Sequence, residues 1–158
     1  MVKGKKHICN TFSIKNHFKS FQGIFEKDSN WYNKLGKSVI KNHIDEKYQH
    51  FLAQPIVEAD NIKWYAKFDE TAVRFNELSD DEIDKYQKIL NDTLTHYENT
   101  VKRLKQNGKT NESILLQKAI KNVDEQFVYC FEDKVVLGVW GMQLRDNIIE
   151  PYGNGEVA

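Results

Sequence analysis

The spacing of large apolar residues near the start of the chain predicts a helix. Four of them fall at i, i+4, i+7 and i+11, which places their side chains on one helical face. They are Ile14, Phe18, Phe21 and Phe25. A second helix is predicted from Ser29 or Asn30 to a stop before Pro55, whose ring clashes with a continuing helical backbone. Its apolar positions are Leu35, Val39, Ile44, Tyr48 and the pair Phe51/Leu52.

Beyond Pro55 the apolar positions recur with a period of two, which is typical of a β-strand. The alternation covers Ile62, Trp64, Ala66 and Phe68 on one side and Lys63, Tyr65 and Lys67 on the other. A short apolar pair at 56–57 and a turn-like segment at 59–61 precede it. These features predict a β-hairpin with one apolar face and one wet face.

A long helix is predicted to begin after Ser79. Ser79 and Glu82 have the spacing of a capping box, and the acidic residues of this first turn suit the positive end of the helix dipole. Asn107-Gly108 ends the helix. Its apolar stripe comprises Ile83, Leu90, Tyr97 and Leu104, widened by Tyr86, Leu94 and Val101. A shorter helix from about Glu112 to Asn122 returns along it, with Leu115, Ala119 and Val123 on the facing side, so the two form an antiparallel helical hairpin.

A second β-hairpin is predicted from two apolar runs, at 126–131 and 135–142, on either side of the polar turn 132–134. Both faces of these strands are apolar, which indicates a central, covered position. Gly138 and Gly141 flank Trp140 and indicate a bulge or a tightly packed site. The predicted fold is therefore α+β: a small antiparallel sheet of two hairpins covered by helices, including a long helical hairpin. We expect one domain over 1–150 and a tail or the start of a linker over 151–158.

Composition agrees with a single packed domain. The chain has 158 residues, of which 40% are hydrophobic and 29% charged, with no net charge. No apolar stretch approaches the roughly 20 residues of a membrane span, and no signal-peptide core follows the charged N-terminus. With two cysteines, neither of them in a CxxC motif, a reducing compartment is favoured, and we expect a cytoplasmic protein.

The strongest candidate for a metal site consists of His43, Glu46 and His50, which would share one face of the second helix at i, i+3 and i+7. One helix supplies too few ligands, and no complementary His/Asp cluster stands out elsewhere, so a solvated polar face is the favoured interpretation. The sequence contains no GxGxxG, GxxxxGK[ST], GxSxG or HExxH motif. Catalytic residues and a cofactor are accordingly not predicted.

Neither cysteine has the surroundings of a nucleophile. Cys9 lies two residues from His7, in a terminus that we expect to be flexible, and Cys130 lies in an apolar strand where cysteine packs as a small hydrophobe. A structural role is favoured for both.

Charge is distributed unevenly along the chain. Residues 1–50 contain ten lysines and four acidic residues, whereas 51–158 contain thirteen basic and nineteen acidic residues. Lysines interleaved with aromatic residues in the basic part could bind nucleic acid or a partner protein. The residues concerned are Lys15, Lys19, Lys34, Lys37 and Lys41. Arginine is scarce, and the aromatic residues fall on core-like spacing, so nucleic-acid binding is the alternative here.

The order of motifs over about residues 55–142 resembles a module of uncharacterised Gram-negative bacterial multi-domain proteins. The resemblance covers Ile62-x-Trp64-Tyr65, Leu78-Ser79-x-x-Glu82, the helical pair, and the segment from Phe127 to Gly141. It implies a bacterial origin and a part in a larger assembly, but no activity. The favoured function is a non-enzymatic protein–protein interaction or assembly module, such as the N-terminal domain of a longer chain. The alternatives are nucleic-acid binding and, less favoured, a metal-dependent enzyme.

Overall fold

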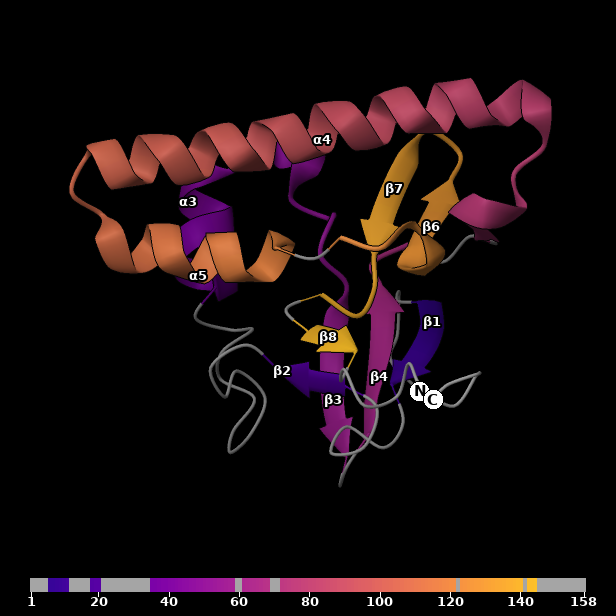
Figure 1. Cartoon of the computed structure of the whole chain (residues 1–158), viewed down its shortest axis with the longest axis horizontal. Helices are drawn as coiled ribbons and strands as arrows, with labels where there is room; N and C mark the ends of the chain where they lie inside the picture. The colour runs from indigo at the N-terminus through magenta and orange to yellow at the C-terminus, as the bar shows by residue number, and fades with distance from the viewer. Residues whose placement is uncertain are drawn as a thin grey trace.

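The computed structural model of this chain describes residues 6–11, 18–20, 35–58, 61–68, 72–121, 123–140 and 142–144. Two antiparallel helices lie over one side of a set of short strands, as Figure 1 shows, with the long helix α4 spanning the molecule. The α+β class predicted from the sequence is confirmed. The predicted tail at 151–158 and the end of the predicted domain lie outside the described residues.

Helix α4 (Asp80–Gln106) begins after Ser79, as predicted. The capping box is not formed in its usual way, because the Ser79 side chain does not accept a backbone N–H. Instead the Ser79 hydroxyl donates to the Glu82 carboxylate at 3.2 Å. The position of the helix start was therefore predictable, whereas the hydrogen bonds of its cap were not.

The C-terminal end of α4 is a Schellman turn, in agreement with the predicted stop. Gly108 has φ +78°, a left-handed conformation that glycine adopts without steric cost. The Lys109 N–H donates to the Leu104 carbonyl at 2.8 Å and the Gly108 N–H to the Lys105 carbonyl at 3.2 Å. The chain then reverses into α5 (Thr110–Ile120), which completes the predicted helical hairpin.

The buried face of α4 follows the predicted stripe at Tyr86, Leu90, Tyr97 and Leu104. Leu94 and Val101 are only half-buried, and Thr93 and Thr100 are buried in addition. Ile83 was expected on this face but is 40% exposed. Tyr86, nearly one turn further on, already touches the tip of a β-hairpin through the Glu132 carbonyl, so Ile83 lies beyond the part of the helix that the strands cover.

The first predicted hairpin is present as β3 (Gln54–Glu58) and β4 (Asn61–Ala66), paired antiparallel from Glu58↔Asn61 to Gln54↔Tyr65. Ile62, Trp64 and Ala66 are buried, which confirms the predicted apolar face. A third strand, β1 (Lys6–Thr11), pairs with the other edge of β4. The expectation of a flexible terminus is thus wrong for residues 6–11, because their backbone completes the sheet order β1-β4-β3.

The second predicted hairpin is formed by β6 (Val128–Phe131) and β7 (Lys134–Leu137), with β5 (Val73–Arg74) as a short edge strand next to β6. Every residue of β6 is buried, as the two apolar faces predicted. The second strand ends at Leu137, however, and does not continue to Met142. Val139 has φ +52°, which takes the backbone out of the extended conformation.

The chain extends again as β8 (Met142–Leu144), which pairs antiparallel with β2 (Phe18–Ser20). Phe18 was expected in the first helix, so that prediction is wrong for 18–20, where the backbone pairs with a strand more than a hundred residues away. Ile14, Phe21 and Phe25 lie outside the described residues. The two predicted hairpins were expected in one sheet but belong to separate three-stranded sheets, β1-β4-β3 and β5-β6-β7. Strands β2 and β8 form a third, two-stranded sheet.

The predicted second helix is shorter than expected and interrupted. A π-helical segment at Leu35–Ile40 continues into the short α3 (Lys41–His43), and a 3-10 turn follows at Glu46–Tyr48. Ile44 separates them with φ −100° and ψ 134°, an extended conformation. The apolar positions of this segment are nevertheless in the core, with Leu35, Val39, Ile44, Phe51 and Leu52 buried and Tyr48 half-buried.

The segment after this turn joins the two large sheets. Leu52 forms a parallel bridge with Leu137, and the Ala53 N–H donates to the Leu137 carbonyl at 3.0 Å. The Trp140 Nε1–H donates to the Ala53 carbonyl at 2.7 Å, and the Trp140 ring lies edge-to-face with Trp64 at 5.7 Å. One continuous core results. Among the helices that the structure describes, none has the length and apolar composition to cross a bilayer.

Candidate functional site

An open groove of about 580 Å³ lies where four separate parts of the chain meet. One wall is the segment 46–50, which contains the 3-10 turn. Another is formed by Asp133 of the β6–β7 turn and Lys134, the first residue of β7. Lys67 and Phe68, which directly follow β4, also line the groove, and the middle of α4 contributes Ile89, Asp92 and Thr93. We call this the 46–50 groove.

The 46–50 segment is fixed to the core by hydrogen bonds along its length. The Tyr97 hydroxyl of α4 donates to the Tyr48 carbonyl at 2.7 Å, and the Gln49 side-chain amide donates to the Ile44 carbonyl at 2.8 Å. The Phe51 ring packs against Tyr97 at 5.3 Å. The wall of the groove is therefore preorganised although only one 3-10 turn of it is regular structure.

A histidine of α4 supports the start of the same segment. His96 accepts a hydrogen bond at its Nε2 from the Asp45 N–H at 3.1 Å, and its ring stacks at a tilt on Tyr48 at 4.9 Å. Burial lowers the pKa of His96, which agrees with the neutral imidazole that this accepting nitrogen requires. His96 therefore acts as a structural support of the groove wall.

Phe68 is the centre of an aromatic cluster in the groove. The His50 ring meets it edge-on with a centroid separation of 5.1 Å, and Phe131 of β6 packs against it at 5.4 Å. The Lys134 ammonium lies over the Phe68 ring, 5.4 Å from its centroid. An apolar surface of this kind, surrounded by charged groups, is suited to an amphipathic ligand.

The imidazole of His50 lies in a positively charged environment. Its pKa is lowered from 6.5 to about 4, first by burial and then by the charges of Lys134 and Lys67, with Asp133 acting in the opposite direction. His50 is therefore neutral at pH 7. Neither of its ring nitrogens has a hydrogen-bond partner among the described residues. His50 lines the groove, so a polar or charged ligand there could bond to it.

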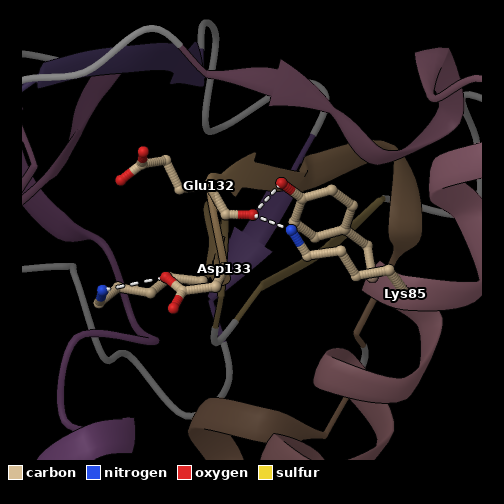
Figure 2. Close-up of polar contacts among 5 residues, drawn as sticks. Lys85, Glu132 and Asp133 are labelled. Atoms are coloured by element: carbon tan, nitrogen blue, oxygen red, sulfur yellow. Dashed lines mark hydrogen bonds and ion pairs between the residues drawn. The ribbon is translucent and has the colours of Figure 1, made fainter.

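The β6–β7 turn has an unusual backbone conformation. Glu132 has φ +43°, a left-handed conformation that is uncommon for a residue with a side chain. Its carbonyl oxygen accepts hydrogen bonds from two α4 side chains, the Lys85 ammonium at 2.9 Å and the Tyr86 hydroxyl (Figure 2). These two bonds fix the turn to the helix and so compensate for the backbone cost.

The side chains of this turn remain exposed. Figure 2 shows the carboxylate of Glu132 directed away from Lys85, on the other side of the turn from the carbonyl. Asp133 pairs with Lys134 at 3.3 Å, and this hydrogen bond lowers the pKa of the Asp133 carboxyl. The turn thus presents a fixed backbone and a local ion pair to the groove.

The structure separates the residues of the predicted metal site. His43 ends α3, Glu46 starts the 3-10 turn and His50 follows it, so the extended conformation at Ile44 removes the helical spacing on which the prediction depended. Glu46 and His50 line the groove, whereas the His43 carbonyl accepts from Arg103 at 3.0 Å. No group of three or more His, Cys, Asp or Glu residues positioned for a metal ion occurs in the described part of the chain.

The lysines predicted as a binding surface are only partly described. Lys37 and Lys41 are exposed on the π-helical segment and on α3. Lys19 lies on β2 without a described side chain, and Lys15 and Lys34 lie outside the described residues. The structure places neither Lys37 nor Lys41 in the 46–50 groove.

The two cysteines have different surroundings. Cys130 is buried in β6, and burial, with Glu82 as a smaller cause, raises the pKa of its thiol to about 12. It is therefore a thiol at neutral pH and not a nucleophile. Cys9 pairs with Trp64 in the β1–β4 ladder.

Sequence reasoning missed Lys67, Phe68 and Lys134 as groove residues. It placed Lys67 and Phe68 on a strand and Lys134 in a turn, whereas in the structure β4 ends at Ala66 and Lys134 is the first residue of β7. No spacing in the sequence relates two segments 66 residues apart. Only the contact of the β6–β7 turn with the end of β4 brings them together. No family model, curated protein or solved structure matches this chain.

Proposed function

We propose that this chain is a non-enzymatic protein–protein interaction module that binds a partner polypeptide in the 46–50 groove. The observation that carries the proposal is the lining of this groove, in which an aromatic and aliphatic floor is bordered by charged side chains of both signs. Apolar centres with polar rims are typical of polypeptide-binding surfaces.

The rigidity of the groove supports the same function. Its walls are held by hydrogen bonds from α4, through Tyr97 to one wall and through Lys85 and Tyr86 to the other. A preorganised surface binds at a lower entropic cost, because few of its side chains must be ordered by the partner.

The pKa values of His50 and Cys130 favour a binding function over catalysis by these residues. The pKa of His50, about 4, makes this imidazole a weak base at neutral pH, and the raised pKa of Cys130 makes its thiol a weak nucleophile. By contrast, a residue that acts as a general base at neutral pH has a pKa near 7.

Site-specific photo-crosslinking tests the proposal. A photoreactive amino acid replaces Lys67 in the groove or, as a control, the exposed Lys109 at the turn between α4 and α5. We expect a protein from the native host to crosslink at position 67 and not at 109. With that protein purified, Lys67→Glu should weaken its binding about tenfold or more, because it reverses a charge in the groove, whereas Lys109→Glu should leave affinity within about twofold.

The same experiment tests the alternative function, in which the chain binds nucleic acid through Lys37 and Lys41. Crosslinking after nuclease treatment separates the two cases, because a protein partner survives it. A crosslink that nuclease removes, or equal crosslinking at both positions, would contradict the proposal. The bacterial, multi-domain origin that the sequence resemblance implies stays a prediction, and the identity of a captured partner would test it.

A further inference from the structure

We infer that the 46–50 groove receives a carboxylate from an acidic segment of the partner, with Lys67, Lys134 and His50 as its binding groups. The inference rests on the proposed function and adds the chemistry of the ligand to it. Three arguments carry it: the placement of the three side chains, the balance of charge in the groove, and the unsatisfied imidazole.

Two of the three side chains lie against one aromatic ring, and the third belongs to the residue next to that ring in the chain. The His50 ring and the Lys134 ammonium both lie against Phe68, at 5.1 and 5.4 Å from its centroid, and Lys67 precedes Phe68 directly in the chain. All three line the same groove although they come from three separate segments. A ligand beside Phe68 would therefore lie close to the His50 imidazole and the Lys134 ammonium, with Lys67 in the lining of the same groove.

The acidic residues of the groove do not balance this positive charge at its centre. Asp92 pairs with Lys88 at 2.8 Å, a lysine outside the groove lining, and Asp133 pairs with Lys134 at 3.3 Å. Glu46 is exposed at the groove wall, next to Lys47, whose ammonium lies over the Tyr48 ring at 5.0 Å. At the imidazole, the effects of Lys134 and Lys67 both exceed that of Asp133. An anion placed there gains from this field.

A carboxylate would give the imidazole of His50 a hydrogen-bond partner. The imidazole is half-buried and has no hydrogen-bond partner among the described residues. Its ring nitrogens are still accessible to solvent, and so to a ligand. A carboxylate can accept a hydrogen bond from its N–H. The negative charge would also raise the pKa of His50 above its free value of about 4, so binding takes up a proton and tightens as pH falls.

NMR titration of the histidine ring provides the test on the full chain. The probes are hexaglutamate and hexaglutamine peptides, capped at both ends, and the His50 signal is assigned by its loss in His50→Phe. We expect hexaglutamate to raise the pKa of His50 from about 4 to about 5 or above, and hexaglutamine to leave it unchanged.

Charge variants provide the matched controls. Lys67→Gln combined with Lys134→Gln should raise the pKa of His50 in the free protein and weaken hexaglutamate binding about tenfold. Lys109→Gln removes one exposed positive charge at the turn between α4 and α5, outside the groove lining, and should change neither quantity. Sulfate binding by wild type should tighten as pH falls from 6 to 4, through the two pKa values of His50 and in a range in which sulfate itself does not titrate. His50→Phe keeps a ring against Phe68 and should reduce this pH dependence.

A hexaglutamine peptide with a free C-terminus separates the two sources of the carboxylate. Preference for hexaglutamate supports the acidic segment inferred above, whereas equally tight binding of this hexaglutamine peptide would identify a C-terminal carboxylate as the ligand and overturn the acidic segment. An unchanged pKa of His50 with hexaglutamate overturns the inference, as does tighter binding of a single-stranded oligonucleotide of equal charge.

Failure of this inference and failure of the proposed function give different results. If the partner crosslinked at position 67 binds the Lys67→Gln, Lys134→Gln variant as tightly as wild type, the groove docks a polypeptide through other chemistry and only the carboxylate site is overturned. If hexaglutamate shifts the pKa of His50 but no protein crosslinks in the groove, the carboxylate site stands and the interaction function does not.

Discussion

The two β-hairpins of this protein have similar lengths and two-residue connections, but they are buried differently. In β4, buried residues alternate with half-buried ones, so one face of that sheet meets the core and the other is partly exposed. In β6 every residue is buried, and in β7 only Lys134 is not. A hairpin covered on both faces depends on its neighbours at almost every position, whereas a hairpin covered on one face depends on them at every second position.

The neighbours of the β6–β7 hairpin come from both halves of the chain. Its tip is held by Lys85 and Tyr86 of α4, and its end is bridged through Leu137 to the segment 51–53. The β3–β4 hairpin obtains its third strand from β1. Mutations of residues that connect these two hairpins should therefore have the largest effect on stability.

Trp140→Ala should cause the largest loss, about 3–5 kcal/mol in the free energy of unfolding. Trp140 is 1% exposed, contacts Trp64 of the first hairpin and donates to the Ala53 carbonyl at the junction. Denaturant unfolding measures the loss. Trp140→Phe, which retains an aromatic ring but not the Nε1–H, should cost about 1–3 kcal/mol, and a near-wild-type stability of Trp140→Ala would mean that this tryptophan does not join the hairpins.

The stability cost of a threonine substitution can be compared between a fully buried and a half-buried strand position. Val136→Thr introduces a hydroxyl at a fully buried position of β7 without changing the shape, and we expect a loss of about 1–3 kcal/mol. Lys63→Thr, on the half-buried face of β4, should cost less than Val136→Thr, because a hydroxyl there stays in contact with water. Equal effects in urea melts would show that the two hairpins are covered alike.

Stability should also fall at acidic pH because of His50, which lies beside both hairpins. The unfolded chain protonates this imidazole near 6.5, whereas the folded chain does so only near 4. The contribution is therefore fully present above pH 6.5 and is lost as pH falls to about 4. After a reduction for its partial exposure we expect a loss of about 2 kcal/mol.

His50→Phe is the control for this pH dependence, because it keeps a ring against Phe68 but cannot titrate. Urea midpoints at several pH values between 7 and 4 should vary less in this variant than in wild type. The lowered pKa of His96 acts in the same direction, so part of the dependence remains. An unchanged pH profile would mean that His50 is as easily protonated in the folded chain as in the unfolded chain.

The elements that were predictable from the sequence are those with local signals. The start of α4 after Ser79, its end at Gly108 and both hairpin turns depend on residues a few positions apart, so the sequence contains the necessary information. Strand β2 has none, because its partner β8 is more than a hundred residues away. The helical spacing that includes Phe18 was therefore misleading.

The groove was unpredictable for the same physical reason. His50 was singled out from the sequence, but with His43 and Glu46 as metal ligands on one continuous helix. The actual surroundings of His50 are Lys67, Phe68 and Lys134, which the tertiary fold brings together from the end of one hairpin and the turn of the other. No spacing in the chain relates them.

The smallest expected effect concerns the start of α4, which carries the tip of the second hairpin. A serine N-cap that accepts a backbone N–H contributes about 1 kcal/mol. The Ser79 hydroxyl instead donates to the exposed Glu82 carboxylate at 3.2 Å. We therefore expect Ser79→Ala to cost about 0.5 kcal/mol, measured by urea unfolding, with Glu82→Gln as a matched variant that keeps an acceptor for the hydroxyl and should cost less. A loss of 1 kcal/mol or more in Ser79→Ala would indicate that the hydroxyl caps the backbone in solution. The tip of the β6–β7 hairpin would then rest on a helix start that is held more firmly than the Ser79–Glu82 hydrogen bond alone implies.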